Sequence, residues 1–76
     1  MRELLEYIAR ELVDNPDAVT VEETTDDRGV LLRLHVDQQD MGRVIGRGGR
    51  TARAIRQVVK IVAIREGVHA HVDIAD

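Results

Sequence analysis

The chain has 76 residues, of which 14 are acidic, 11 are basic and none is cysteine, and its net charge is −3. This length predicts one domain spanning residues 1–76, and the lack of cysteine excludes a disulfide framework or a thiolate metal site. Residues 1–13 mix charged and apolar side chains at helical spacing, so we expect neither a signal peptide nor a membrane span. A chain without cysteine fits the reducing cytoplasm, where we expect the protein.

The first half of the chain predicts one helix followed by a hairpin. Apolar residues recur at intervals of three and four over residues 2–13, which predicts an amphipathic helix that ends before Pro16. β-branched residues favour a strand over residues 19–25, and Gly29 closes the following polar turn, where it is free to take a positive φ. Alternation of apolar and polar side chains over residues 30–36 predicts a half-buried second strand.

The second half of the chain predicts two helices and a last strand. A short helix capped by Asp37 or Asp40 is expected to run toward Ile45, and the longest helix is expected over residues 50–65. Alternating side chains over residues 68–74 then predict the last strand. The order α-β-β-α-α-β predicts an α+β fold in which three helices pack on one face of a three-stranded mixed sheet.

The most informative segment lies between these helices. Residues 41–65 contain seven of the eleven basic residues and no acid, whereas residues 1–40 carry eleven acids and four bases. At its centre lies the tetrapeptide Gly46-Arg47-Gly48-Gly49. Glycines let a ligand's backbone approach closely, and arginines offer forked donors for phosphate oxygens. The segment therefore predicts a clamp for a phosphate backbone on an otherwise acidic protein, with a merely solvated basic helix face as the alternative.

The spacing of the glycines distinguishes this segment from nucleotide-binding loops. A P-loop needs four residues between its glycines and then Lys-Ser or Lys-Thr, and the chain has neither. The dinucleotide fingerprint G-x-G-x-x-G fails because Thr51 occupies its third glycine position and because the loop joins two helices. A G-x-x-G loop that clamps the backbone of four nucleotides is the feature of KH domains.

Residues 42–52, with the sequence GRVIGRGGRTA, resemble the KH signature, and the element order resembles the type II, bacterial arrangement of that fold. The whole chain looks like the KhpA family of small stand-alone KH proteins, with a minimal KH motif at about residues 30–75. This resemblance implies binding of single-stranded RNA without catalysis, as an RNA chaperone or a post-transcriptional regulator. It also implies dimers, including pairing with KhpB, a larger protein that carries its own KH domain.

The expected RNA contacts surround the glycine loop. Loop amides and the start of the long helix are expected to bind phosphates, and the resemblance implies a groove beside the loop that accepts about four unstacked bases. Met41, Val44 and Ile45 are candidates to line that groove, with core packing as the alternative for each. The predicted RNA-binding residues are Arg43, Val44, Ile45, Gly46, Arg47, Gly48, Gly49, Arg50, Thr51 and Arg53.

The long helix is predicted to have a core face, a basic face and an apolar remainder. The core face is expected to pack on the sheet, and the basic face is expected to meet solvent or ligand. The core face comprises Ala52, Ile55, Val59 and Val62. The basic face comprises Arg50, Arg53, Arg56 and Lys60. Ile61 and Ile64 lie off the core face, so we expect one or both to be exposed and to form a homodimer contact. A dimerisation subunit of an RNA-binding complex is therefore the alternative function.

The remaining features predict no further site. No nucleophile–base pair is visible, so we expect no enzyme, no cofactor and no small-molecule substrate. His35, His69 and His71 are expected on the sheet face opposite the helices, but their ligand set is incomplete and we expect no metal. Tyr7 is the only aromatic residue, which excludes the stacking platform of an RRM. Single-stranded DNA stays an alternative ligand, because no residue is identified that senses a 2′-hydroxyl group.

Overall fold

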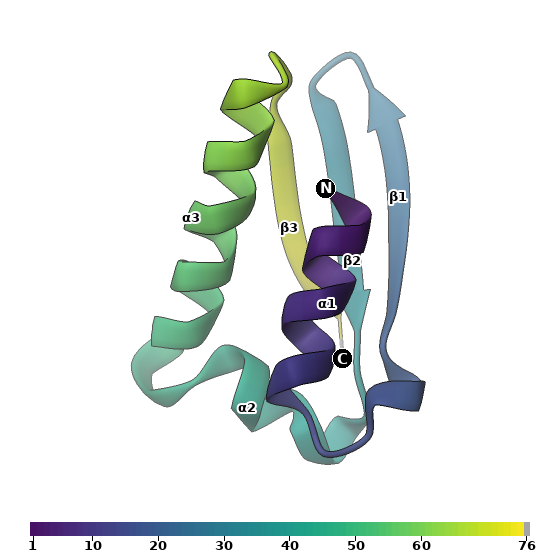
Figure 1. The fold of residues 1–76 in the computed structure, drawn as a ribbon, viewed down its shortest axis with the longest axis vertical. Coiled ribbons are helices and arrows are strands. Elements are labelled where there is room, and N and C mark those ends of the chain that lie inside the picture. Colours follow the sequence, from purple (N-terminus) through teal and green to yellow (C-terminus); the bar gives the residue numbers. More distant parts are fainter. Residues whose placement is uncertain (76) are drawn as a thin grey trace.

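Figure 1 shows a computed structural model of the chain, which describes residues 1–75. Its helices and strands are α1 (Arg2–Leu12), β1 (Thr20–Asp26), β2 (Gly29–His35), α2 (Met41–Ile45), α3 (Arg50–Arg65) and β3 (Ala70–Ala75). Three short 3-10 helices lie at Pro16–Ala18, Gln38–Asp40 and Arg47–Gly49. The predicted order of helices and strands is confirmed, as is the α+β fold with three helices and a mixed sheet. Within residues 1–75, no helix is both long and apolar enough to cross a membrane.

The sheet has the strand order β1-β2-β3. β1 and β2 form an antiparallel hairpin in which Asp26 pairs with Gly29, and Gly29 takes the positive φ of 123° that the turn requires. β2 and β3 run parallel, with Leu32 opposite Val72. Parallel neighbours need a long crossover, and the chain between them contains α2, the glycine loop and α3. The predicted phosphate clamp therefore lies within the connection that the sheet topology demands.

The core lies between the sheet and the helices, which cover one sheet face (Figure 1). Alternation along β2 turns Val30, Leu32 and Leu34 toward the helices, where both leucines are fully buried. α1 contributes Leu5 and Ala9, and α3 contributes the buried residues Ala52, Ile55, Val59 and Ala63. The predicted core face of α3 is confirmed at its first three positions, whereas Val62 is half-buried and Ala63 occupies the fourth position.

The last strand begins later than the sequence predicts. Val68, the predicted first residue of this strand, instead helps to close α3, because Gly67 takes a φ of 73° and its N–H bonds to the carbonyl of Ile64. The N–H of Val68 reaches back to the carbonyl of Ala63 at 3.0 Å, which completes a Schellman cap. His69 consequently lies before β3, so only His35 and His71 of the three histidines belong to strands.

Candidate nucleic-acid interface

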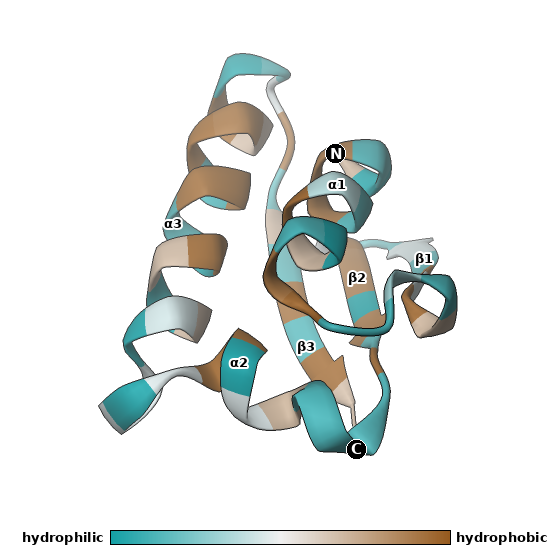
Figure 2. Cartoon of the chain, turned by 60° about the horizontal axis from the view of Figure 1, so that its bottom comes forward, coloured by the Kyte–Doolittle hydropathy of each residue, from teal (hydrophilic) through white to brown (hydrophobic). Residues whose placement is uncertain are grey.

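The backbone of residues 46–49 reverses the chain between α2 and α3. Gly46 follows the last residue of α2 and has a φ of 75° and a ψ of 171°. Residues with a Cβ rarely adopt this backbone conformation. A tight turn follows in which Gly48 takes a left-handed φ of 63°, and Gly49, with a φ of 79°, precedes α3 as its N-cap. In Figure 2 this connection projects away from the rest of the molecule and is hydrophilic at its tip. The G-x-x-G pattern therefore forms an exposed reversal between two helices, as the sequence predicts.

Gly46 and Gly48 serve different purposes in this reversal. A Cβ added to Gly46 would lie 2.8 Å from both the Cβ and the backbone nitrogen of Thr51, and would overlap its hydroxyl oxygen. Thr51 therefore packs directly against Gly46 and fixes the loop on the first turn of α3. A Cβ added to Gly48 would meet nothing within 4 Å. The open space is at Gly48, which is where a ligand can approach the backbone.

The start of α3 is open to an anion. Its N-cap, Gly49, has no side chain to accept from the first N–H groups, and its first turn contains no acidic residue. Such a helix end carries a partial positive charge and unsatisfied donors, which favour phosphate oxygens. Two loop amides are already used, because the N–H of Gly49 bonds to the carbonyl of Gly46 and that of Arg50 to the carbonyl of Arg47. Of the four amides of residues 47–50, those of Gly49 and Arg50 are therefore not free to bind a ligand.

The arginines around the loop are not equivalent. Arg47 and Arg50 are exposed and take part in no ion pair among residues 1–75, so their guanidinium groups are available to a ligand. Arg53 instead donates from Nη1 to the carbonyl oxygen of Gly48 at 3.1 Å. That bond links the tip of the reversal to the end of the first turn of α3. Arg53 therefore shapes the loop in addition to contributing charge.

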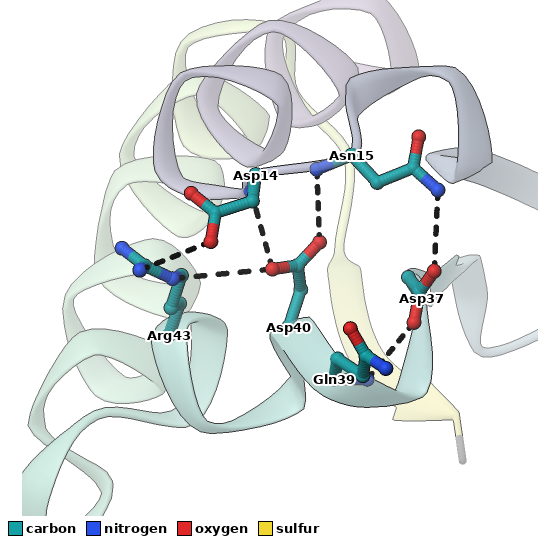
Figure 3. A network of polar contacts seen from close by, with 6 residues as sticks. All are labelled: Asp14, Asn15, Asp37, Gln39, Asp40 and Arg43. Carbon is teal, nitrogen blue, oxygen red and sulfur yellow. Dashed lines mark hydrogen bonds and ion pairs between the residues drawn. The ribbon is translucent and has the colours of Figure 1, made fainter.

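Arg43 lies in an acidic network that joins α1 to α2 (Figure 3). Its Nη2 is 3.1 Å from the Oδ2 of Asp14, and its Nε is 3.9 Å from the Oδ1 of Asp40. Asp40 is only 3% exposed, yet its carboxylate accepts from the backbone N–H groups of Asp14 and Asn15, both at 3.1 Å. This carboxylate compensates for its burial by hydrogen bonding. The network anchors α2 to the end of α1, and it holds Arg43 by two carboxylates.

The two predicted caps of the short helix behave differently. Asp37 caps the 3-10 helix Gln38–Asp40, since its side chain accepts from the N–H of Gln39 at 2.9 Å. Asp40 precedes α2 but caps nothing with its side chain, because the carboxylate reaches across to the end of α1. Hydrogen bonds from Gln39 and from Asn15 lower the pKa of Asp37. These hydrogen bonds therefore stabilise the folded protein fully above the ordinary aspartate pKa. That stabilisation is lost as the pH falls through the lowered pKa of Asp37.

The three apolar candidates to line a base-binding groove, Met41, Val44 and Ile45, differ in their burial. Val44 is fully buried in the core, so it supports α2 from beneath and offers no surface to a base. Ile45 is 39% exposed at the end of α2, directly before the loop, whereas Met41 is half-buried. Of the three candidates, Ile45 is the most exposed and lies next to the loop in the chain.

The sequence did not indicate a further groove between α3 and the edge strand β3. Arg56 donates from Nε to the carbonyl oxygen of Val72 at 3.2 Å, and the space beside this contact is about 230 Å³. It is lined by Arg56, Lys60, Ala70, His71 and Val72. The basic face of α3 therefore meets the strand edge and not solvent alone. The helical spacing predicted that Arg56 lies on the basic face. It could not predict that β3 lies beside that face, because Arg56 and Val72 are 16 residues apart.

The exposed apolar residues of α3 lie on two sides of the helix. Ile61 is 55% and Ile64 is 65% exposed, which confirms the expected exposure. Ile64 lines a groove of about 410 Å³ next to β3. On the side toward α1, a separate apolar groove of about 320 Å³ is lined by Ile8, Leu12, Thr51, Ala54, Ile55 and Val58. Val58 lies three residues before Ile61, so these two exposed side chains are neighbours on one helix face.

The sheet face opposite the helices carries paired polar side chains. His35 lies 2.7 Å from Glu22, and Arg33 lies 3.2 Å from Asp73, in both cases between neighbouring strands. Within residues 1–75, no group of three or more His, Cys, Asp or Glu side chains is placed to hold a metal ion. These contacts are cross-strand pairs on an exposed surface, which contribute little to stability.

The amino-acid sequence is similar to those of known proteins. Residues 2–74 match the family model described as KhpA/KhpB, KH domain. A protein of Clostridium acetobutylicum named RNA-binding protein KhpA is 49% identical over 74 residues, which is 97% of this chain and 99% of the relative. The protein of that name from Halalkalibacterium halodurans is 45% identical over the full length of both chains. That of Mycobacterium tuberculosis is 44% identical over 95% of this chain and 86% of the relative.

Alanine substitutions at two loop glycines test their different environments. Gly46→Ala adds a collision with Thr51 to the strain of a positive φ, so we expect it to lower the free energy of unfolding by about 2–4 kcal/mol. Gly48→Ala meets open space and should cost only about 1 kcal/mol, from the left-handed backbone alone. Urea unfolding followed by circular dichroism measures both values. Equal losses would show that Thr51 does not fix the loop.

Proposed function

Because the chain belongs to the KhpA/KhpB family of KH domains, we propose that it binds single-stranded RNA through the loop of residues 46–49. The observation that carries this proposal is the uncapped, acid-free N-terminus of α3 behind an exposed glycine reversal. Its relatives in Clostridium and Halalkalibacterium bear the name RNA-binding protein KhpA, which supports the same conclusion.

In the proposed complex the RNA backbone lies over Gly48, where the missing side chain leaves room for a phosphate. Open N–H groups at the start of α3 donate to the phosphate oxygens, and the guanidinium groups of Arg47 and Arg50 flank these contacts. These contacts position the strand but do not read its sequence. Bases then turn toward Ile45 and the basic face of α3, which requires them to be unpaired.

The charge distribution orients the RNA on this surface. Residues 1–40 carry eleven acids against four bases, whereas residues 41–65 carry seven bases and no acid. A polyanion is therefore attracted at the loop and repelled over most of the remaining surface. The chain contributes binding alone in this proposal, with no catalytic step, which suits an RNA chaperone or a post-transcriptional regulator. Competition between RNA and DNA oligonucleotides of one sequence decides which nucleic acid it prefers.

A second proposed role is assembly through α3. Ile61 and Val58 are exposed neighbours, and they adjoin an apolar groove between α1 and α3. A contiguous apolar surface of this kind on a small domain favours self-association. We propose that this surface forms a homodimer, or pairs with a larger KhpB-like KH protein through the equivalent helix. Ile61 lies near the opposite end of α3 from the glycine loop, whereas the groove itself reaches Thr51 beside that loop.

Reversing the charge of the loop tests the RNA clamp. Arg47→Asp combined with Gly48→Asp removes one cationic donor and brings two negative charges to the phosphate site. We expect the affinity for a mixed-sequence single-stranded RNA to fall roughly 10- to 100-fold, measured by fluorescence anisotropy at fixed salt. The fold should persist, because the site of Gly48 is open and aspartate tolerates left-handed backbone better than most residues.

Arg65→Asp is the matched control for this variant, because Arg65 is exposed on the last turn of the same helix, far from the loop. It should change affinity much less than the loop variant does. Wild-type affinity should also fall steeply as salt rises, since phosphate binding releases counterions. Unchanged RNA affinity in the loop variant would reject the loop as the binding site.

Ile61→Asp tests the proposed assembly surface. A buried, unpaired charge would oppose association, so we expect this variant to be monomeric where the wild type is dimeric, as measured by sedimentation equilibrium. Tyr7→Asp is the control, because Tyr7 is a comparably exposed apolar side chain on α1. A dimer that survives Ile61→Asp would place the contact elsewhere on the molecule.

A further inference from the structure

The groove between α3 and β3 presents an arginine in a fixed orientation. β3 is an edge strand, so one side of its backbone is not paired with another strand. Arg56 crosses from α3 to that edge and donates from Nε to the carbonyl oxygen of Val72 at 3.2 Å. This bond uses one of five guanidinium N–H groups and orients the two Nη groups, which take part in no ion pair among residues 1–75.

This arginine lies close to the proposed phosphate site. Arg56 is six residues beyond Arg50, and a helix rises 1.5 Å per residue, so it lies about 9 Å along α3 from the loop. Arg53, which lies between them, is held by the carbonyl of Gly48. Arg56 is therefore the next basic side chain that a nucleotide leaving the loop along this groove would meet.

The surroundings of Arg56 suit a base. The groove beside it adjoins the larger one of about 410 Å³, since Lys60, Ala70 and His71 line both. Ala63, Val68 and Ala70 give the larger groove an apolar lining, and none of the described residues that line either groove is acidic. A flat aromatic base can cover apolar side chains, whereas a phosphate would have to be desolvated against them.

The free part of the guanidinium selects among the bases. Two coplanar Nη donors match two adjacent acceptors, and guanine offers such a pair in its N7 and O6 atoms. Adenine places an N6 amino donor where guanine has O6, so it opposes the second donor. From this geometry we propose that Arg56 is a specificity-determining residue that reads the N7–O6 edge of a guanine in the single-stranded RNA. The proposal rests on the RNA-binding function proposed above.

The test uses uridine-rich RNA oligonucleotides that carry one guanosine, one adenosine or one 7-deazaguanosine, moved through the central positions. At one register the wild type should bind the guanosine oligonucleotide about tenfold more tightly than the other two. Arg56→Lys keeps the charge but lacks the fork, so it should bind all three with the affinity that the wild type shows for adenosine. Arg65→Lys is the matched control on the same helix and should keep the preference for guanosine.

The outcomes separate this proposal from the function on which it rests. A uniform loss of affinity for all three oligonucleotides in Arg56→Lys would make Arg56 a phosphate contact and overturn the proposal. A wild type that binds RNA without preferring guanosine at any register would also overturn it, while leaving the loop clamp intact. Failure of the wild type to bind any of the oligonucleotides would overturn both.

Discussion

The parallel pairing of β2 with β3 is the constraint on which the rest of the molecule depends. Parallel neighbours cannot be joined by a tight turn, so the chain must leave one end of the sheet and return to the other. α3 makes the return, and it buries Ile55 and Val59 against the sheet as it does so. The reversal that precedes α3 then projects from the end of the molecule, with the positive end of the helix behind it (Figure 2). Burial of one helix face thus determines where the glycine loop is presented.

A second set of interactions fixes α2, on which the loop begins. The buried carboxylate of Asp40 binds backbone N–H groups at the end of α1, and Thr51 packs against Gly46 from the start of α3. Packing and hydrogen bonds therefore fix both ends of the loop, while the space around the Cα of Gly48 is open to solvent. In the proposed RNA complex, preorganisation of this kind would lower the entropic cost of binding, because the loop would not have to form around its ligand.

The sequence predicted the parts that depend on local patterns. The helices, the hairpin, the glycine loop and the basic segment follow from spacing, turn chemistry and charge along the chain. It could not predict contacts between distant segments, such as Arg43 with Asp14 or Arg56 with the edge carbonyl of Val72. The start of β3 was misplaced for a related reason, because alternation at residues 68–74 does not reveal that Val68 is used to cap α3. Val44 was ambiguous because an apolar residue beside a loop fits a groove and a core equally well.

Backbone amide NMR during a titration with single-stranded RNA tests the clamp most directly, because it reports on the wild-type protein residue by residue. Binding at the glycine reversal predicts that the largest chemical-shift changes fall on residues 46–53 and continue along the α3–β3 groove. The amides of β1 at the far edge of the sheet should change little. Changes centred on the outer sheet face around Glu22 and His35, with the loop unaffected, would contradict a phosphate clamp at the start of α3.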